Sequence, residues 1–248
     1  MTTTKTHTPE EIARLSVELE ERIPQDVLRW AVDEFFPDLT MACSFGGPSG
    51  MVLVDMIAKI EPRVEVFYLD TDFLFPETYA TRDRVIERYG VSAVGYRSEL
   101  TPQQQAEKHG DELWARDPDL CCALRKIEPN QRALAGKRAW ISGLRRDQAA
   151  TRRETPAVQW DAKFGLVKIN PLVRWTEADV WAYIVKHDVP YNPLHDQGYP
   201  SVSCTYCTRP VEEGDDLRAG RWQGTDKTEC GIHTPDIIPL VRGEENTG

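Results

Sequence analysis

The chain has 248 residues, of which 40% are hydrophobic and 28% charged, and its formal net charge is −10. This composition predicts a folded globular protein of one large or two small domains and excludes a largely disordered chain. A chain this acidic is a poor general binder of nucleic acid, and no apolar stretch approaches the roughly 20 residues that cross a bilayer.

Apolar periodicity predicts alternating helices and strands up to about residue 190. Two helices are expected in an N-terminal extension over residues 1–37, the first beginning at Thr8 and Pro9 and the second covering residues 26–36. Strands are expected at residues 39–45, 64–69, 92–96, 138–143 and 166–170. Further helices are expected at residues 51–60, 76–89, 101–109, 121–135 and 176–187.

Repeated strand–turn–helix units predict an α/β fold, a mostly parallel twisted sheet flanked by helices. Ligands of such sheets bind at the carboxyl ends of the strands, so we expect residues 44–50, 70–71 and 143–146 to converge on one site. The chain beyond about residue 190 is rich in proline and glycine and has little periodicity. We therefore expect an α/β domain over residues 1–190 and a loop-rich C-terminal segment over residues 191–248, forming one structural unit.

A glycine-rich turn, containing Ser44, Gly46, Gly47 and Ser49, follows the first expected strand and opens a helix. In this context backbone N–H groups and the helix dipole bind anions, and glycines allow a ligand to approach the backbone closely. The turn is neither a Walker A sequence nor a dinucleotide fingerprint. The alternative is an ordinary tight turn between a strand and a helix.

Six cysteines are too few for a disulfide scaffold, and the N-terminus lacks the apolar region of a secretory signal, so we expect a cytoplasmic protein. Four of the cysteines form an adjacent pair and a CxxC motif: Cys121, Cys122, Cys204 and Cys207. They are expected to bind a zinc ion or an iron–sulfur cluster, the alternative being four inert core cysteines. Neighbours on a helix point about 100° apart, which favours a cluster with separate irons over one zinc ion.

Basic residues form three candidate anion contacts in this acidic chain. Lys126 follows Cys122 by one helical turn and is expected to screen the cluster charge from an anionic substrate, the alternative being a solvated surface lysine. Gly143, Arg145 and Arg146 open a run with further arginines, which suits bidentate capture of phosphate or sulfate unless it is a solvated basic loop.

The C-terminal segment carries another basic pair, Arg218 and Arg221. Their alternative is surface ion pairing with the acidic residues that precede them, namely Glu212, Glu213, Asp215 and Asp216.

A lone cysteine, Cys230, lies between Glu229 and Gly231 and is followed by His233. His233 or the arginines are expected to lower the pKa of its thiol, and the neighbouring glycine permits close approach to a substrate. The alternative is an exposed cysteine without a role. Cys43, at the end of a strand, is expected to be a small buried hydrophobe.

In combination, these features resemble the iron–sulfur type of assimilatory adenylylsulfate (APS) reductases. The resemblance spans roughly residues 40–235 and is carried by the Ser44-x-Gly-x-x-Ser49 turn, Leu69-Asp70-Thr71, the four paired cysteines and residues 229–233. The turn alone is similar to the wider PP-loop, adenine nucleotide alpha-hydrolase-like group, which includes the 3′-phosphoadenylylsulfate (PAPS) reductases. That group implies a nucleotide-binding domain over residues 1–190.

The resemblance implies thioredoxin-dependent reduction of adenosine 5′-phosphosulfate to sulfite and AMP, in sulfate assimilation and cysteine biosynthesis. Cys230 would be the catalytic nucleophile and would carry an S-sulfocysteine intermediate, and Cys121, Cys122, Cys204 and Cys207 would hold one [4Fe–4S] cluster. The expected substrate-binding residues are Ser44, Gly46, Gly47, Ser49, Asp70, Thr71, Lys126, Gly143, Arg145, Arg146, Arg218, Arg221 and His233.

Other activities compatible with part of the pattern are a PAPS or dual-substrate reductase, a PP-loop ATP pyrophosphatase, and a cluster-based redox sensor. The pyrophosphatase does not account for residues 229–233, and the sensor does not account for the converging anion-binding loops. Thioredoxin and the nucleotide are the expected partners, without nucleic acid or membrane. The sequence is compatible with a monomer and with a homo-oligomer.

Overall fold

The computed structural model describes residues 7–212 and 214–234. Its centre is a six-stranded sheet in the order β3-β2-β1-β4-β6-β5, in which all neighbours are parallel except β5 and β6. The strands are β1 (Leu39–Ala42), β2 (Glu65–Asp70), β3 (Ala93–Arg97), β4 (Ala139–Ile141), β5 (Val158–Asp161) and β6 (Leu166–Ile169). The expected α/β class is confirmed, and the antiparallel edge strand β5 is an element that the sequence pattern did not predict.

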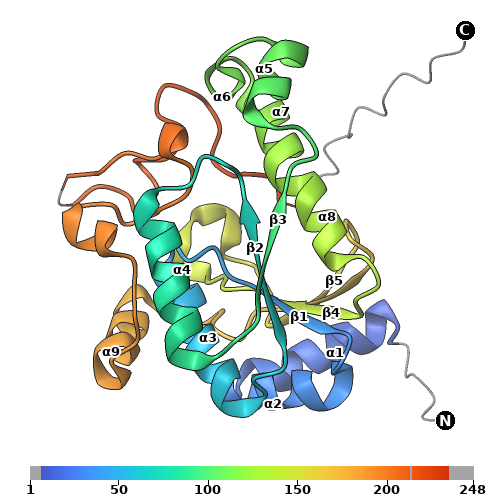
Figure 1. Cartoon of the computed structure of the whole chain (residues 1–248). Coiled ribbons are helices and arrows are strands. Elements are labelled where there is room, and N and C mark those ends of the chain that lie inside the picture. Colours follow the sequence, from blue (N-terminus) through green and yellow to red (C-terminus); the bar gives the residue numbers. More distant parts are fainter. Residues whose placement is uncertain (1–6, 213, 235–248) are drawn as a thin grey trace, which may run out of the picture.

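The longer helices connect and cover these strands (Figure 1). Their bounds are α1 (Pro9–Glu20), α2 (Pro24–Phe35), α3 (Pro48–Ile60), α4 (Pro76–Tyr89), α5 (Pro102–His109) and α9 (Glu177–His187). Local signals explain several ends: Thr8 and Thr176 form capping boxes at α1 and α9, and Gly90 ends α4 in the left-handed conformation. Among the described residues, no helix is long and apolar enough to cross a membrane.

The stretch expected as one helix over residues 121–135 is instead divided into several pieces. In order, they are the end of α7 (Pro118–Cys122), the π-helix η1 (Ala123–Ile127) and α8 (Glu128–Leu134), and a separate short helix, α6 (Leu113–Arg116), precedes them. A π segment makes hydrogen bonds one residue longer than the α-helix does, and so it changes which side chains share a face. The predicted helix is therefore confirmed in position, but a π segment interrupts its α-helical geometry.

Alternate residues of the strands supply two hydrophobic clusters, one on each face of the sheet. Val66 and Ile141 belong to the larger cluster, with α1, α2, α3 and α9, whereas Phe67 and Trp140 belong to the smaller one, with α8. In Figure 1, α4 and α8 flank β2 and β3 on opposite sides.

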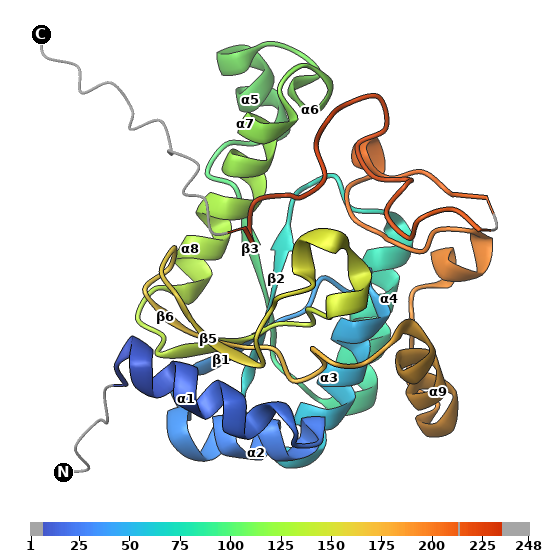
Figure 2. The ribbon, with the colours of Figure 1, turned by 180° about the vertical axis from the view of Figure 1, so that it is seen from behind.

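Strands β2 and β3 lie on one side of β1, and β4 lies on the other, so the strand order reverses between β1 and β4. Ligands of open α/β sheets bind at such a switch point, outside the carboxyl ends of the strands. Two short 3-10 helices, η2 (Arg146–Gln148) and η3 (Ala150–Arg152), follow β4. Two more, η4 (Pro193–Gln197) and η5 (Thr205–Cys207), lie in the C-terminal segment that follows α9. Figure 2 shows this orange-to-red segment running past the carboxyl ends of the strands towards α8.

Candidate active site

A pocket lies at the switch point, lined by the loops after β1, β2 and β4 and by the C-terminal segment. The glycine turn is part of its lining: Gly47 is the N-cap of α3, and the Ser44 hydroxyl accepts a hydrogen bond from the Gly46 N–H at 3.3 Å. A Cβ on Gly46 would come within 2.9 Å of the Val202 carbonyl oxygen. Glycine is therefore needed here because the C-terminal segment packs directly on the turn.

The loop after β4 meets the glycine turn from the other side of the switch point. A Cβ on Gly143 would lie 3.2 Å from the Ser49 Cβ, so the two loops are in contact. Arg145, only 1% exposed, donates hydrogen bonds to Ser49, Glu177 and Asp147. Although Arg145 lines the pocket, these partners make it primarily a brace between the two loops.

Arg146, expected at the site, points away from it. Its guanidinium pairs with Glu20 at 2.5 Å and donates to the Thr155 carbonyl at 2.9 Å, and the residue does not line the pocket. A second arginine of the same run, Arg152, lines the pocket instead. The sequence marked the basic run but contained no signal that ranked its members.

At the end of β2, Asp70 and Thr71 have different surroundings. Asp70 is buried and does not line the pocket; its carboxylate accepts hydrogen bonds from Tyr79 at 2.6 Å and Arg97 at 2.7 Å. Burial raises the pKa of Asp70, but these donors outweigh it and lower the pKa below its usual value. Thr71 does line the pocket, and its Oγ1 lies 3.2 Å from the Sγ of Cys204.

A second, smaller pocket brings together the adjacent pair and the CxxC motif, since Cys121, Cys122, Cys204 and Cys207 all line it. Three aromatic rings help to enclose it, with Trp114 stacked on Tyr206 at a centroid distance of 3.9 Å and Phe73 against both edge-on. Among the described residues, no three His, Cys, Asp or Glu side chains are grouped so that they could hold a single metal ion.

Two cations of the π-helix lie beside the four thiols. Arg125 is 1% exposed and donates to Gln105 at 2.7 Å and to Asp72 at 3.0 Å. Lys126 is 8% exposed, donates to the Ser203 hydroxyl at 2.7 Å, and lines both pockets. The alternative of a solvated surface lysine at position 126 is therefore wrong, and Lys126, like Thr71, links the thiol cluster to the larger pocket.

The arginines of the C-terminal segment also face the larger pocket. Arg218 donates to Glu229 at 3.2 Å, and Arg221 donates to the Ser201 hydroxyl at 3.1 Å. No described carboxylate among the preceding acidic residues forms an ion pair with either side chain. Glu213, in the same acidic run, lies outside the described residues.

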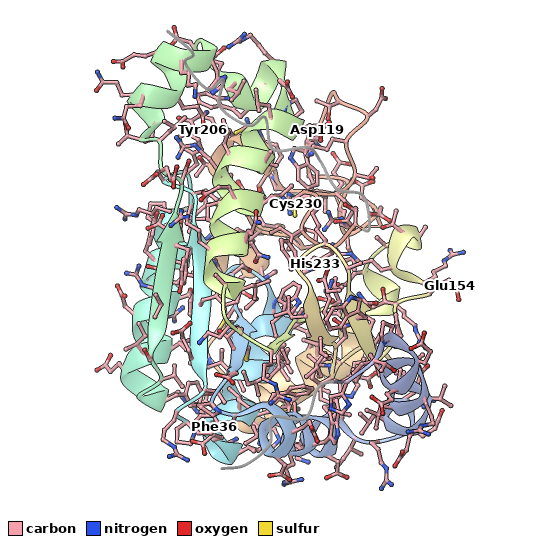
Figure 3. All side chains as sticks on the ribbon, turned by 90° about the vertical axis from the view of Figure 1, so that its right-hand side faces the viewer. Phe36, Asp119, Glu154, Tyr206, Cys230 and His233 are labelled. Carbon is pink, nitrogen blue, oxygen red and sulfur yellow. The ribbon has the colours of Figure 1, made fainter. Side chains whose placement is uncertain are left out.

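The described end of the chain docks into the same pocket in consecutive steps. Glu229 is held by Arg152 through two contacts of 2.8 Å. Gly231 accepts a hydrogen bond from Lys163 through its carbonyl oxygen at 2.5 Å. Ile232 packs on the smaller hydrophobic cluster, and His233 stacks on Trp140 at 5.7 Å. These contacts place Cys230 inside the pocket, in a half-buried position (Figure 3).

The electrostatic surroundings of Cys230 favour its thiolate. Burial raises the pKa of this thiol, but the Lys126 ammonium and a backbone hydrogen bond at Ile232 more than offset that, with Arg221 acting in the same direction. The pKa of Cys230 is therefore below the ordinary thiol value. The same cations would reduce the repulsion between this thiolate and an anion that entered the pocket.

Most of the residues expected at the site are brought together by the fold. Those that line the larger pocket are Ser44, Gly46, Gly47, Ser49, Thr71, Lys126, Gly143, Arg145, Arg218, Arg221, Cys230 and His233, whereas Asp70 and Arg146 do not. Sequence reasoning missed Gln148, Arg152 and Ser203, which also line it. Polar side chains in loops carry no periodic signal, so only the structure identifies them.

A family comparison matches residues 38–210 to the phosphoadenosine phosphosulfate reductase domain. The chain is 53% identical over 216 residues to the adenosine 5′-phosphosulfate reductase of Halalkalibacterium halodurans, covering 87% of this chain and 93% of that protein. It is 50% identical over 208 residues to adenosine 5′-phosphosulfate reductase 1 of Bacillus subtilis, covering 84% and 89% respectively.

Among solved structures, the chain is similar to a phosphoadenylyl-sulfate (PAPS) reductase from Candida auris in a phosphate complex. The TM-score is 0.73 at 37% sequence identity, and the match covers 84% of this chain and all of that one. The FMN adenylyltransferase of Candida glabrata, at 13% identity and a TM-score of 0.55, shares the fold alone; the match covers 90% of this chain and 78% of that one.

Proposed function

The chain belongs to the phosphoadenosine phosphosulfate reductase domain family, and we propose that it reduces adenosine 5′-phosphosulfate to sulfite and AMP in sulfate assimilation, with thioredoxin as the reductant. One observation carries the proposal: Cys230, a thiol with a lowered pKa, shares a pocket with the glycine turn and lies under the influence of Lys126. In this proposal the pocket combines a glycine turn that binds the adenylyl group with Cys230 as the nucleophile.

The proposed reaction has two stages. In the first, the Cys230 thiolate attacks the sulfur of the phosphosulfate; an S–S bond forms, the S–O bond to the phosphate breaks, and AMP leaves. In the second, a thiolate of reduced thioredoxin attacks the Sγ of Cys230 and releases sulfite. The second thioredoxin thiol then resolves the mixed disulfide and returns Cys230 as a thiol. Thioredoxin is oxidised to its disulfide and supplies the two electrons that reduce the sulfur.

The residues that line the pocket divide between two tasks. We assign binding of the nucleotide to the glycine turn together with Thr71 and Gly143, which line the same pocket. The turn leads into the N-terminus of α3, where backbone N–H groups can bind the phosphate. We assign neutralisation of the phosphosulfate to Lys126, Arg218 and Arg221. AMP is a good leaving group, so positioning and charge neutralisation are the main requirements of the reaction.

Two expected contacts take other roles in this proposal. Asp70 holds the end of β2 through Tyr79 and Arg97, and Arg146 ties the loop after β4 to Glu20 of α1. Arg152 replaces Arg146 as the second cation contributed by that loop.

We further propose that Cys121, Cys122, Cys204 and Cys207 hold one [4Fe–4S] cluster. The donor set fits: four thiols surround one small pocket, with Arg125 and Lys126 to balance the negative charge and a Thr71 hydroxyl in hydrogen-bonding contact with Cys204. When bound, the cluster supplies a fixed charge and a structural link between the π-helix and the C-terminal segment. The proposed chemistry at Cys230 requires no electron from it.

The unphosphorylated nucleotide is the preferred substrate in this proposal. Relatives at 50–53% identity are named adenosine 5′-phosphosulfate reductases, whereas the PAPS reductase structure is 37% identical. The four paired cysteines favour the same substrate, since the sister PAPS reductases are expected to lack them. A reductase that accepts both nucleotides is the second candidate.

Reduced thiols are required at all five positions, so we propose a cytoplasmic location, where thioredoxin keeps thiols reduced. The C-terminal segment contributes Cys204, Cys207 and Cys230 to pockets built otherwise from the sheet domain. We therefore propose that residues 1–190 and 191–248 act as one catalytic unit.

Turnover assays with reduced thioredoxin test the proposal. We expect sulfite and AMP to form in equal amounts from adenosine 5′-phosphosulfate, with a higher kcat/KM than for the 3′-phosphorylated nucleotide. Release of pyrophosphate from ATP and magnesium, without sulfite formation from either nucleotide, would instead identify an ATP pyrophosphatase. Absence of both activities in protein that carries its cluster would favour a redox sensor.

A further inference from the structure

A buried lysine beneath the docked C-terminal residues has no part in the proposed chemistry. Lys168 lies in β6, is 1% exposed, and pairs across the sheet with Trp140 of β4 and Gln159 of β5. A lysine in this position is rare, because a buried ammonium loses its hydration and must find partners inside the protein. Its partners therefore show what it is there to hold.

The ammonium of Lys168 contacts the ring of His233 and the face of Trp140. Its Nζ lies 3.1 Å from the Nδ1 of His233 and 5.0 Å from the centroid of Trp140. Trp140 in turn donates its indole N–H to Asp161 at 3.3 Å and stacks on His233 with the rings 11° from parallel. His233 is thus held over Trp140 from one side and at its Nδ1 from another.

The protonation state of Lys168 sets the direction of this hydrogen bond. Burial and the nearby Arg152 lower the pKa of Lys168, Asp161 raises it, and the result is about 8, so the amine is mostly protonated at neutral pH. An ammonium has hydrogens to donate and no lone pair to accept, so Nδ1 of His233 must accept. A neutral imidazole that accepts at Nδ1 carries its proton on Nε2.

The wider surroundings of His233 also oppose its protonation. Burial lowers the pKa of His233 well below its usual value, and Lys168, Arg152, Arg218 and Lys163 act in the same direction. They come from β6, η3, the C-terminal segment and the turn between β5 and β6. Asp161 of β5 and Glu229 are the nearby acids, already engaged by Trp140 and by the two arginines.

We propose that Lys168 is a positioning residue: it fixes His233 as a neutral imidazole with its proton on Nε2, and so holds Cys230 in the pocket. Cys230 and His233, labelled in Figure 3, belong to the same docked segment, and both line the pocket. The arrangement supplies an N–H donor at the pocket wall from the tail itself. The inference rests on the proposed function only in taking the pocket as the substrate site.

Docking of the C-terminal residues is expected to depend on pH. Docking of the tail requires neutral His233, whereas the undocked tail takes up a proton near the ordinary histidine pKa of about 6.5. Docking is therefore complete above that pH and weakens as the pH falls below it. Lys168 stays in the sheet whether or not the tail is docked, and it remains protonated at acidic pH. The loss of docking at acidic pH is therefore assigned to protonation of His233.

Nitrogen-15 NMR of the imidazoles tests the assignment directly on the full chain with its cluster bound. The protein has five histidines, and the signal lost in His233→Gln identifies His233. We expect an unprotonated Nδ1 and a protonated Nε2 that persist to a pH well below the ordinary histidine range. In Lys168→Met, the midpoint is expected to move up towards the ordinary value and the two tautomers to mix.

Two further variants separate positioning from folding. Lys168→Arg keeps a donor and should retain the Nε2–H tautomer, whereas Lys186→Met, on an exposed residue of α9, should leave His233 unchanged. A protonated Nδ1 in the wild-type protein, or an unchanged tautomer and midpoint in folded Lys168→Met, would overturn the proposal. If Lys168→Met fails to fold, the wild-type tautomer and the Lys168→Arg spectrum decide alone.

The acid limb of kcat/KM supplies an independent functional readout. We expect it to move to higher pH in Lys168→Met and to stay in place in Lys186→Met. An enzyme without turnover of either phosphosulfate would overturn the proposed function, yet it would leave the NMR result to decide the role of Lys168.

Discussion

Two cysteines line the same pocket, but their surroundings give their thiols opposite properties. Cys43 directly follows β1 and is 2% exposed. The pKa of its thiol is raised to about 12, because burial outweighs a hydrogen bond from the Phe45 backbone. Cys230 lies in the C-terminal segment, where Lys126 and Arg221 lower its pKa despite burial. Burial by itself thus raises the pKa of a thiol, whereas burial beside fixed cations lowers it and favours the thiolate.

The largest effect is expected from replacing each of these cysteines in turn. Cys230→Ser should reduce sulfite formation by at least about a thousandfold, since the nucleophile is lost, while nucleotide binding and cluster absorbance remain. Cys43→Ser should keep most of the activity. Thioredoxin-coupled turnover and equilibrium binding of AMP measure both results. Normal turnover by Cys230→Ser would refute the assignment of the nucleophile.

The next largest effect is expected from the ion pair between Arg152 and Glu229. Cys43 is held in place by the sheet, whereas the position of Cys230 depends on contacts such as this one that dock the C-terminal segment. Arg152→Gln should lower kcat/KM by roughly 10- to 100-fold, because a partly buried ion pair and a pocket cation are lost together. Arg153→Gln is the matched control: this neighbour is exposed and does not line the pocket. Equal losses in both variants would show that general charge, not the Glu229 contact, matters.

The electrostatic origin of the contrast is open to direct titration. Alkylation of Cys230 by iodoacetamide should rise with pH at a midpoint below that of an ordinary thiol, because its pKa is lowered, whereas Cys43 should stay unreactive in the folded protein. Lys126→Gln should raise the Cys230 midpoint and slow alkylation at pH 7 by about tenfold. Lys186→Gln serves as the control. An unchanged midpoint in Lys126→Gln would separate Lys126 from thiol activation.

The smallest effect on activity is expected at Cys43 itself. Cys43→Ala removes a buried sulfur that packs against Gly50, and it should cost about 1–2 kcal/mol of stability with little change in kcat. Denaturant unfolding and steady-state kinetics measure the two quantities on one preparation. A large loss of kcat without a loss of stability would mean that Cys43 takes part in the chemistry.

Much of the fold was predictable because its signals are local. Pro9, Pro76 and Gly90 mark helix ends, and the apolar runs of the parallel strands lie where the periodicity predicts them. Strand β5 escaped prediction because Val158–Asp161, at an antiparallel edge and paired only with β6, includes the polar residues Gln159 and Asp161 and lacks the continuous apolar run that marks the buried parallel strands. The π-helix escaped it because its hydrogen-bond shift leaves no mark in composition.

The candidate site was predictable to the extent that motifs carried it. The glycine turn and Cys230 reach one pocket, and Cys43 is buried as expected. Charged side chains were harder: Arg146 pairs with α1 and Arg152 enters the pocket, although both belong to one basic run. Which arginine faces inward depends on tertiary ion pairs, and no local rule encodes them.

Mass spectrometry of the protein after incubation with adenosine 5′-phosphosulfate, in the absence of thioredoxin, tests the central proposal most directly. The account predicts one added SO₃ group on the peptide that contains Cys230, none on the peptide that contains Cys43, and complete removal with release of sulfite when reduced thioredoxin is added. A protein that turns over the nucleotide without acquiring this group, or that carries it on another residue, would contradict the account.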